Sequence, residues 1–397
     1  MIILGIFLLN QIRTGGDRRC LELLELLAER GNRVIVLTNC FLDYRNKHFI
    51  KIDLPIKYVL HRFPPASWLF RKHIKKNITA IRAELVRLDA PELDFIHIHG
   101  DTHLKAALWL QRCLKTPLFY AFRSNDIDRA HILRTRGRLG FRAYFFSLLN
   151  EPINRFREKQ AARFAELLTF QNVPDRDRFL RRTGCPEEKT VIIPGNIGPP
   201  RCAPEWQQKN ASQGVEKIVY VGSLSADKGL WGLLKALALL KKRGFSNLKC
   251  SLLGRAETID KTVRLVKNLG IAEMVSFEGY QDPFPYLVSG DLMVYPTLYD
   301  AYPDTVLESL HAGCPVIASS VGGLPDLLRY PELLFESGNI EEMASRIERC
   351  ITDSVFYRRL RALCADRAQA HRFDWAERFE KAMAEFLERE SQVSPQK

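Results

Sequence analysis

One repeated pattern constrains the fold of this chain more than any other feature: short apolar runs alternate with amphipathic stretches. Runs rich in β-branched residues predict strands, and stretches with apolar residues at helical spacing predict helices. In the first half we expect strands at residues 2–9, 33–38, 95–99 and 118–122, and helices at residues 17–30 and 103–114. Strand–helix–strand repetition with short connections indicates a doubly wound parallel α/β sheet.

The second half repeats this pattern. We expect strands at residues 217–221, 249–253, 275–278, 292–295 and 315–318, and helices at residues 230–242, 260–269 and 305–312. The segment between the halves is rich in proline and glycine, which is typical of a linker. We therefore predict an N-terminal domain (1–195), a linker (196–213), a C-terminal domain (214–374), and a helix (375–390) that packs back on the N-terminal domain.

Open α/β sheets bind their ligands at the carboxyl ends of the strands. The fold expected is therefore α/β, with two Rossmann-like domains facing each other across a cleft that holds the functional site.

Composition excludes several classes of protein. No apolar run reaches the roughly 18–20 residues that a membrane-spanning helix needs. The apolar start of the chain lacks a charged segment before it and a cleavage site after it, so a buried strand is expected there and not a signal peptide. Nine scattered cysteines without a C-x-x-C pair argue for reduced thiols, against a disulfide framework or a zinc ribbon. We expect a cytoplasmic protein.

The positive charge is confined to one half. Residues 1–200 contain 34 lysines and arginines against 20 acidic residues, a net charge of +14, whereas the remainder contains 25 against 26. Two basic stretches interleaved with aromatic residues, 62–87 and 129–163, account for the excess. This asymmetry indicates a polyanionic partner, and no nucleic-acid-reading motif accompanies it. An anionic membrane surface is the partner expected; a merely solvated basic face is the alternative.

The densest cluster of functional signals lies in residues 299–328. Asp300 precedes a second acid, Glu308, by eight positions, and a helix is expected to start between them. Pro303 suits the entry of such a helix, and Asp304 or Thr305 can cap it. The first amides of a helix and its dipole favour an anionic phosphate. A carboxylate in the first turn, at Glu308, suits a ribose diol.

This segment resembles the GT-B fold family 4 glycosyltransferases, a retaining group whose hallmark is E-x7-E and whose common form reads E-G-F-P-N-V-V-L-E-A-M. The resemblance implies that Glu308 holds the donor ribose and that Asp300 contacts hydroxyls of the transferred sugar. It implies that the backbone around Tyr302 and the next three residues receives the diphosphate. Asp300 is one methylene shorter than the usual glutamate, which changes its reach. The alternative is an acidic loop and a capped helix that bind no ligand.

A second segment, V-G-S-L-S-A-D-K-G, follows a predicted strand and opens a helix. It resembles the family's G-R-L-x-x-x-K-G loop, in which glycine lets the backbone approach phosphate and lysine neutralises the leaving diphosphate. The resemblance makes Lys228 a catalytic residue and places Gly222 at the donor. Ser223 stands where the family usually has arginine, so one cation is missing. A surface lysine without a role is the alternative.

Other positions resemble the family less specifically. Gly15 and Gly16 match a Gly-Gly turn at the cleft, although a tight turn alone explains two glycines equally well. Two strand ends correspond to those that flank the nucleotide base: Gly254 with Arg255, and Gly279 with Tyr280.

Three histidines, His97, His99 and His103, invite a metal interpretation, but no cysteine or carboxylate at ligand spacing completes such a site. His99 ends a strand and resembles the family's V-H-x-H segment, which borders the cleft. Arg123 replaces a histidine that contacts the donor sugar in the family, and Asp126 follows it on the sugar or acceptor side. A guanidinium there suits a phosphate or an acidic group on donor or acceptor. A salt bridge from Arg123 to Asp126 or Asp128 is the alternative.

The resemblance implies transfer of a sugar, with retention at the anomeric carbon, from a nucleotide-diphosphate-sugar to a glycan or lipid-linked acceptor. No cofactor and no obligatory metal are expected, because Lys228 and the helix dipole would stabilise the leaving diphosphate. Two alternatives stay open: an epimerase or phosphorylase on the same scaffold, and a non-catalytic protein that binds nucleotide-sugar or membrane. The substitutions at Ser223, Asp300 and Arg123 keep the second alternative open.

Overall fold

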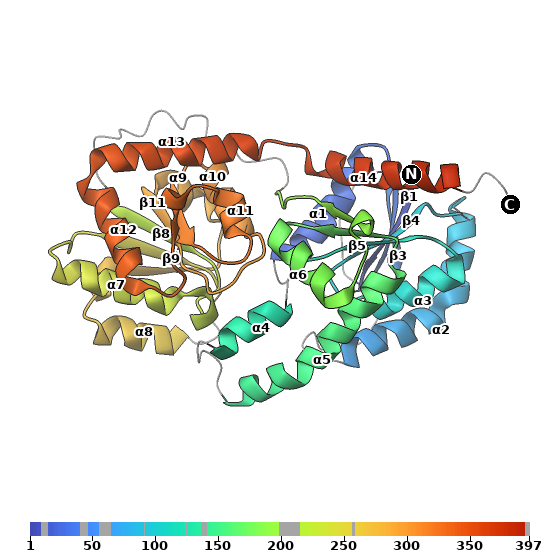
Figure 1. Ribbon diagram of the computed structural model, residues 1–397, viewed down its shortest axis with the longest axis horizontal. Helices are drawn as coiled ribbons and strands as arrows, with labels where there is room; N and C mark the ends of the chain where they lie inside the picture. Colours follow the sequence, from blue (N-terminus) through green and yellow to red (C-terminus); the bar gives the residue numbers. More distant parts are fainter. Residues whose placement is uncertain are drawn as a thin grey trace. The chain divides into compact units, whose positions relative to one another are not determined.

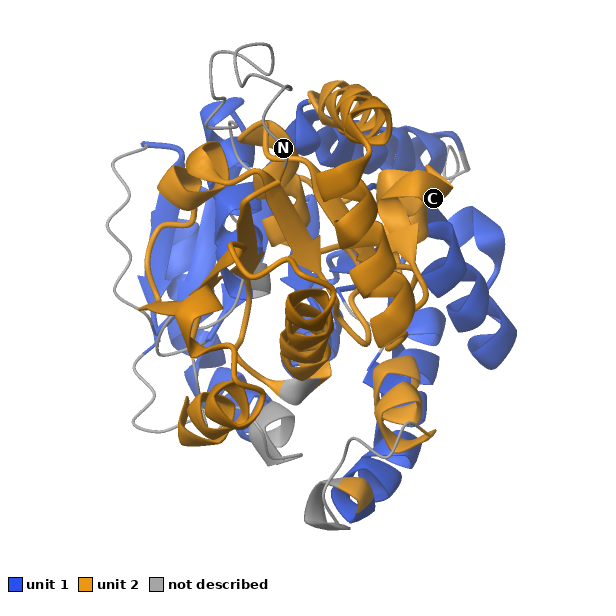
Figure 2. Ribbon diagram, turned by 90° about the vertical axis from the view of Figure 1, so that its left-hand side faces the viewer, with its two compact units in different colours: residues 1–127, 145–194, 374–397 blue, residues 128–144, 195–373 orange. Residues whose placement is uncertain are grey.

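The computed structural model describes residues 1–8, 15–39, 47–54, 65–90, 92–123, 126–135, 141–197, 215–255 and 259–393. The chain forms two compact units (Figures 1 and 2). The first unit comprises residues 1–127, 145–194 and 374–397, and the second comprises residues 128–144 and 195–373. Most of the expected linker, residues 198–213, lies outside the described residues.

The first unit contains a seven-stranded parallel sheet in the order β3-β2-β1-β4-β5-β6-β7. Its strands are β1 (Ile2–Phe7), β2 (Arg33–Thr38), β3 (Phe49–Asp53), β4 (Phe95–His99), β5 (Leu118–Ala121), β6 (Leu167–Phe170) and β7 (Thr190–Ile192). The inner strands are buried along their length, which explains why they consist of continuous apolar runs.

The helices that lie wholly or mainly in this unit are α1 (Gly15–Glu29), α2 (Pro65–Arg87), α3 (Leu104–Leu114), α5 (Phe141–Phe164), α6 (Val173–Thr183) and α14 (Trp375–Val393). Helix α4 (Asp126–Thr135) lies mainly in the second unit. The unit boundaries cut α4 after Ile127 and α5 after Tyr144.

The C-terminal helix α14 packs on the first unit. Phe379 contacts the rings of His97 and Phe119, at centroid distances of 6.3 and 5.7 Å. At the edge of this contact, Arg30 reaches Glu380 and Asp374, each at 2.7 Å. The last helix of the chain thus covers β4 and β5 of the N-terminal sheet.

The second unit contains a six-stranded parallel sheet in the order β10-β9-β8-β11-β12-β13. Its strands are β8 (Lys217–Val221), β9 (Lys249–Leu253), β10 (Val275–Gly279), β11 (Leu292–Tyr295), β12 (Val316–Ser319) and β13 (Leu334–Phe335). Its helices are α7 (Leu230–Lys242), α8 (Ile259–Asn268), α9 (Phe284–Ser289), α10 (Asp304–His311), α11 (Leu324–Leu328), α12 (Ile340–Thr352) and α13 (Ser354–Ala370).

These two parallel sheets confirm the predicted α/β class with two Rossmann-like folds. Each sheet reverses its strand order once, between β1 and β4 in the first unit and between β8 and β11 in the second. Ligands of open α/β sheets bind outside the carboxyl ends of the strands at such reversals. Ligand sites are therefore expected at these two places.

Most of the predicted strands and helices have boundaries that differ from the expected ones by one or two residues. Helix α1 begins at Gly15, so the two glycines expected to form a turn are its first residues. Several elements were not predicted: the strands β3, β6, β7 and β13, and the helices α2, α4, α5, α6, α9, α11, α12 and α13. Among the described residues, no helix is long and apolar enough to cross a membrane.

Candidate functional site

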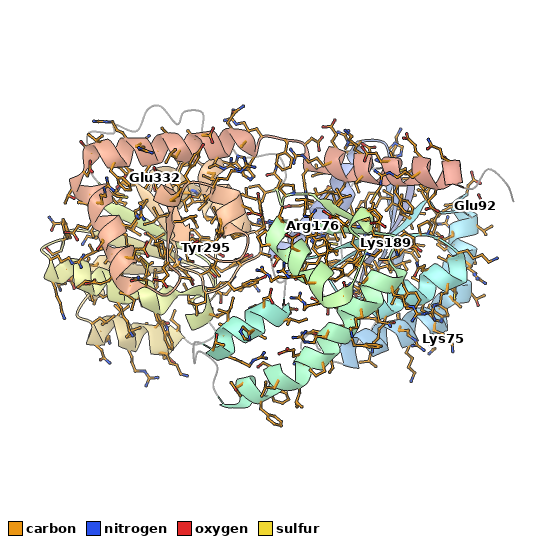
Figure 3. The ribbon with its side chains drawn as sticks, viewed as in Figure 1. Lys75, Glu92, Arg176, Lys189, Tyr295 and Glu332 are labelled. Carbon is orange, nitrogen blue, oxygen red and sulfur yellow. The ribbon has the colours of Figure 1, made fainter. Side chains whose placement is uncertain are left out.

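The strand reversal of the second unit brings together one basic and one acidic side chain that are far apart in the sequence. Lys228 follows β8 and Asp300 follows β11, and their Nζ and Oδ2 atoms lie 2.7 Å apart. Tyr295, labelled in Figure 3, donates from its hydroxyl to the same carboxylate oxygen at 2.8 Å. Asp300 is thus oriented from two sides. The structure confirms neither role assigned to these residues, but it places both at the reversal.

The backbone holds this pair in place through two glycines. Gly229, directly after Lys228, has a φ of +74°, and a Cβ there would lie 1.7 Å from the carbonyl oxygen of Pro296. Gly322 has a φ of +62°, and a Cβ there would lie 1.8 Å from the carbonyl oxygen of Asp300. That same oxygen accepts a hydrogen bond from the Gly323 amide at 3.0 Å. Only glycine fits at these two close approaches, so the loops after β8, β11 and β12 interlock through main-chain atoms.

The loop after β8 is tied to the loops of its neighbouring strands. The amide of Gly222 donates to the Leu253 carbonyl at 2.9 Å, and the amide of Gly254 donates to the Gly279 carbonyl at 2.8 Å. The hydroxyl of Tyr220 donates to the main-chain carbonyl of Ser223 at 2.7 Å. The side chain of Ser223 takes no part in this contact and is exposed. The backbone that the resemblance assigns to phosphate contact is therefore ordered independently of the residue at position 223.

The two strand ends expected to flank the base lie next to each other. The guanidinium of Arg255 stacks on the ring of Tyr280 at 4.3 Å, and that ring is 73% exposed. An exposed aromatic ring backed by a cation presents a flat surface on which a planar base can stack.

Helix α10 begins beyond Asp300, but it is not capped as expected. Pro303 occupies the N-cap position and no side chain caps the helix, so the prediction of a cap from Asp304 or Thr305 is wrong. These two residues are instead the first two of the helix. The reason is the extended backbone of Pro303, with ψ of 126°, which starts the helix one residue earlier. Helix amides start at Asp304, because proline has no N–H.

Glu308 and Tyr302 lie on either side of this helix start. Glu308 is half-buried and is the fifth residue of α10, so it lies just beyond the first turn in which it was expected. Tyr302 is buried, and its hydroxyl lies 2.8 Å from Nε2 of His371. The other ring nitrogen of His371, Nδ1, lies 2.7 Å from the Arg367 carbonyl and must donate to it. Nε2 is then the acceptor and Tyr302 donates, so this hydroxyl is engaged in the protein and only its backbone is available to a ligand.

A second ion pair lies beside Lys228. The guanidinium of Arg129 on α4 contacts Asp227 at 2.9 Å. Burial opposes ionisation of Asp227, but a hydrogen bond from Ser225 and the charge of Arg129 together hold the pKa of this carboxyl below its usual value. Sequence reasoning missed both residues, as it missed Tyr295, because no spacing links α4 to the loop after β8.

In the first unit, a small pocket lies at the reversal between β1 and β4. Its lining residues come from β1, α1, the end of β4 and the residues after β4 and β5: Ile6, Phe7, Asp17, Cys20, His99, Thr102, His103 and Arg123. Arg123 Nη1 lies 3.1 Å from Oδ1 of Asp17, which is buried. The structure thus brings the predicted Arg123 and His99 to one pocket. Asp17 was not predicted as a partner of Arg123.

Two buried histidines in this unit lack hydrogen-bond partners among the described residues. Neither ring nitrogen of His97 or of His99 has one. Burial lowers the pKa of His97 to about 3. Burial lowers the pKa of His99 well below its ordinary value, and His97, Arg123 and Arg19 act in the same direction. Both rings are therefore neutral at physiological pH, and the His99 ring faces the pocket with an acceptor and a donor.

The remaining predicted residues of the first unit lie at the starts of two helices. Asp126 is the first residue of α4 and is exposed. Gly15 and Gly16 open α1 after the end of β1. In the described part of the chain, no group of three or more histidine, cysteine or acidic side chains is arranged to hold a metal ion.

Both halves of the chain match known families. Residues 203–370 match the family described as glycosyl transferases group 1, and residues 13–197 match glycosyltransferase family 4. Among curated proteins, the O-antigen chain mannosyltransferase B of Escherichia coli is 27% identical over 182 residues, covering 45% of this chain and 47% of that protein. The matched part of the chain spans less than half the length of the first curated relatives.

Solved structures resemble the chain over its whole length. Sucrose-phosphate synthase from Thermosynechococcus elongatus matches with a TM-score of 0.74 at 20% identity, covering 98% of each chain. Anabaena HepE, solved in complex with UDP and glucose, matches with a TM-score of 0.68 at 19% identity, covering 98% of this chain and 99% of its own. At this identity the likeness shows the GT-B fold.

Proposed function

Because this chain belongs to the family 4 group of glycosyltransferases, we propose that it transfers a sugar, with retention at the anomeric carbon, from a nucleotide-diphosphate-sugar to a glycan. The observation that carries the proposal is the meeting of Lys228 and Asp300, at 2.7 Å, at the strand reversal of the second unit. A cation and a carboxylate placed there suit the diphosphate and the sugar hydroxyls of one donor.

Each part of the donor then has a counterpart in the second unit. The diphosphate lies at the first amides of α10 and at Lys228, where the ammonium group stabilises charge as the leaving group departs. The ammonium exchanges part of its contact with Asp300 for the phosphate oxygens. Glu308 accepts hydrogen bonds from the ribose hydroxyls, and the base stacks on Tyr280. The UDP bound by Anabaena HepE supports a uridine nucleotide as the first donor to try.

No metal is required in this scheme, since Lys228 and the helix dipole supply the positive charge that the leaving diphosphate needs. A chelator should therefore leave turnover unchanged.

The residues around the pocket of the first unit are proposed to contact the acceptor, and the small pocket itself can take only a single group of it. His99 is neutral and offers one donor and one acceptor to sugar hydroxyls. Arg123 is held by Asp17 at 3.1 Å, which fixes a guanidinium beside the pocket. A planar guanidinium recognises a phosphate or carboxylate, so an acceptor with an acidic group is favoured. The similarity to an O-antigen mannosyltransferase supports a cell-surface polysaccharide or lipopolysaccharide as the acceptor class.

The test is a transfer assay with a panel of nucleotide-sugars, reading release of the nucleoside diphosphate. Lys228→Ala should lower kcat by roughly a hundredfold or more, since it removes a charge that acts mainly in the transition state. Glu308→Ala should mainly raise the KM for the donor, by about tenfold, because it removes a ground-state contact.

Two surface substitutions serve as matched controls. Lys241→Ala and Glu332→Ala remove exposed ion pairs, with Glu273 and Arg359, away from the strand reversal. Both should retain wild-type activity. Equal turnover in all four variants would contradict the proposal, and so would a product formed without any acceptor.

A further inference from the structure

Helix α5 of the first unit presents large apolar side chains to solvent. Phe145, Leu149 and Phe156 are 55%, 52% and 55% exposed, and Pro152 between them is exposed as well. Positions 145, 149, 152 and 156 recur at helical spacing, so they form one row along one side of the helix. We call this row the apolar row. Phe146 and Leu148, at 57% and 44% exposed, widen it over the first turns.

The opposite side of α5 is fixed to the first unit. Glu158 is buried and makes two hydrogen bonds with Arg182, at 2.7 and 2.8 Å. Arg157 reaches Asp101 at 2.7 Å, and Ala161 is buried. The apolar row is therefore not a fraying helix end that has lost its core contacts. It is the outward side of a helix (green in Figure 1) whose inward side is already packed.

Cations continue the same line. Lys159 and Arg163 lie three and seven positions after Phe156, so they extend the row along the helix, and both are exposed. Arg155 lies on its flank. A helix with aromatic and aliphatic residues on its outward side and lysine or arginine beside them is typical of a helix that lies in a membrane interface.

Another helix of the same unit also presents cations to solvent. Helix α2 buries Phe70 and Ile74 and exposes four cations: Arg71, Lys72, Lys75 and Lys76. Lys75, labelled in Figure 3, points away from the unit. The residues of this unit, 1–127, 145–194 and 374–397, contain 33 lysines and arginines against 25 acidic residues, a net charge of +8, so the unit is attracted to an anionic surface before any close contact forms.

We propose that α5 docks the first unit on an anionic lipid surface. Phe145, Leu149 and Phe156 enter the boundary between headgroups and acyl chains, and Lys159 and Arg163 remain at the lipid phosphates. A second copy of the row fits less well, because parallel pairing of two copies sets Lys159 and Arg163 against the same cations of the other copy. The inference goes beyond sugar transfer, and it is tested without turnover.

The experiment is co-sedimentation of the full chain with vesicles of phosphatidylcholine alone or mixed with phosphatidylglycerol. The wild-type protein should sediment with the mixed vesicles and remain in solution with phosphatidylcholine alone. The variant Phe145→Ser/Leu149→Ser/Phe156→Ser should bind the mixed vesicles at least tenfold more weakly. Lys159→Glu/Arg163→Glu should weaken binding by more than about fivefold per charge, because each substitution also introduces repulsion.

Matched controls distinguish the effect of the apolar row and its cations from a general loss of exposed apolar surface or of positive charge. Val173→Ser/Ile259→Ser/Val355→Ser removes three exposed apolar side chains elsewhere, and Lys261→Glu/Lys267→Glu reverses two exposed charges on α8. Both should bind mixed vesicles nearly as the wild type does.

Three outcomes overturn the proposal: equal vesicle binding by the row variant and its control, no vesicle binding by the wild type, or a dimer in analytical ultracentrifugation that the row variant abolishes. Unchanged melting temperatures exclude unfolding as the cause of lost binding. Because sugar transfer is measured separately on a water-soluble acceptor, failure of either proposal leaves the other intact.

Discussion

The two units place their candidate site residues at equivalent strand reversals but hold them by different means. In the second unit the loops after β8, β11 and β12 interlock through main-chain atoms, at Gly229 against Pro296 and at Gly322 against Asp300. In the first unit the pocket is shaped by side chains, with Arg123 held by Asp17 and His99 facing inward. The backbone determines the geometry of one site and side chains determine that of the other.

This difference predicts which substitutions leave the geometry of a site unchanged. Ser223 in place of arginine and Asp300 in place of glutamate change side chains on a scaffold that the glycines keep unchanged. In the first unit, arginine at position 123 is itself part of the pocket wall. A change there alters what the pocket accepts, so the first unit is the place to expect specificity for the acceptor.

The strongest test of backbone control uses the interlocking glycines. Gly229→Ala and Gly322→Ala each place a methyl group within 1.8 Å of a carbonyl oxygen and force alanine into the left-handed region. Each should lose roughly 3 kcal/mol or more of unfolding free energy in urea, because strain and overlap add. Donor affinity should fall in parallel, since both glycines adjoin the Lys228–Asp300 pair.

Gly270→Ala is the control, with a similar φ of +65° but no atom near its would-be Cβ. It should lose only about 1 kcal/mol, the left-handed strain alone. Equal losses in all three variants would mean that the interlock contributes nothing.

The same difference shows why one site was predictable from sequence and the other only partly. Close main-chain contacts require glycine at fixed positions. Glycines between a predicted strand and a predicted helix are a pattern that is visible in the sequence. The loop around Lys228 and the segment around Asp300 were identified through their resemblance to family motifs that include such glycines. The ion pair between them could not, because 72 residues separate them and only the sheet order makes β8 and β11 neighbours.

Elements without such a pattern were missed for physical reasons. Helix α5 has charged residues on its buried side and apolar residues on its exposed side, so it lacks the apolar buried face by which a helix is identified, and it contains Pro152. Strand β13 has only two residues. In the first unit no sequence pattern identified Asp17 as a partner of Arg123. Asp17 lies on α1 and Arg123 follows β5, 106 residues later, so no local spacing links the two residues.

Buried histidines provide a second comparison, with a smaller expected effect. His97 in the first unit has no partner among the described residues, whereas His371 in the second bonds Tyr302 and the Arg367 carbonyl. His97→Leu should stabilise the protein by about 1 kcal/mol at neutral pH, because it removes buried polar atoms without partners. His371→Leu should destabilise it by about 2 kcal/mol, because it leaves the Tyr302 hydroxyl unsatisfied.

Acid sharpens this prediction. The folded-state pKa of His97, about 3, lies below its ordinary value of 6.5, so the unfolded chain binds the proton first and stability falls as pH drops from 6.5 towards 3. Between about pH 6 and pH 4.5 this group alone should cost about 2 kcal/mol. Between these two pH values, the free energy of unfolding measured in urea should therefore fall by about 2 kcal/mol less for His97→Leu than for the wild type. Equal acid sensitivity of the two proteins would show that His97 has a partner or titrates normally.

The smallest expected effect comes from adding a cation to the scaffold of the second unit. Ser223→Arg restores the residue type usual in the family at an exposed position whose backbone is already held by Tyr220. If the backbone sets the site, the new guanidinium should strengthen binding of a nucleotide-sugar only slightly, about two- to fivefold, since exposed charge pairs contribute up to about 1 kcal/mol. Salt should erase the gain by screening. Ser354→Arg, at an exposed serine on α13, controls for net charge and should leave donor affinity unchanged. A gain from Ser223→Arg much above tenfold would instead mean that the missing cation, and not the interlocked backbone, limits donor binding in the second unit.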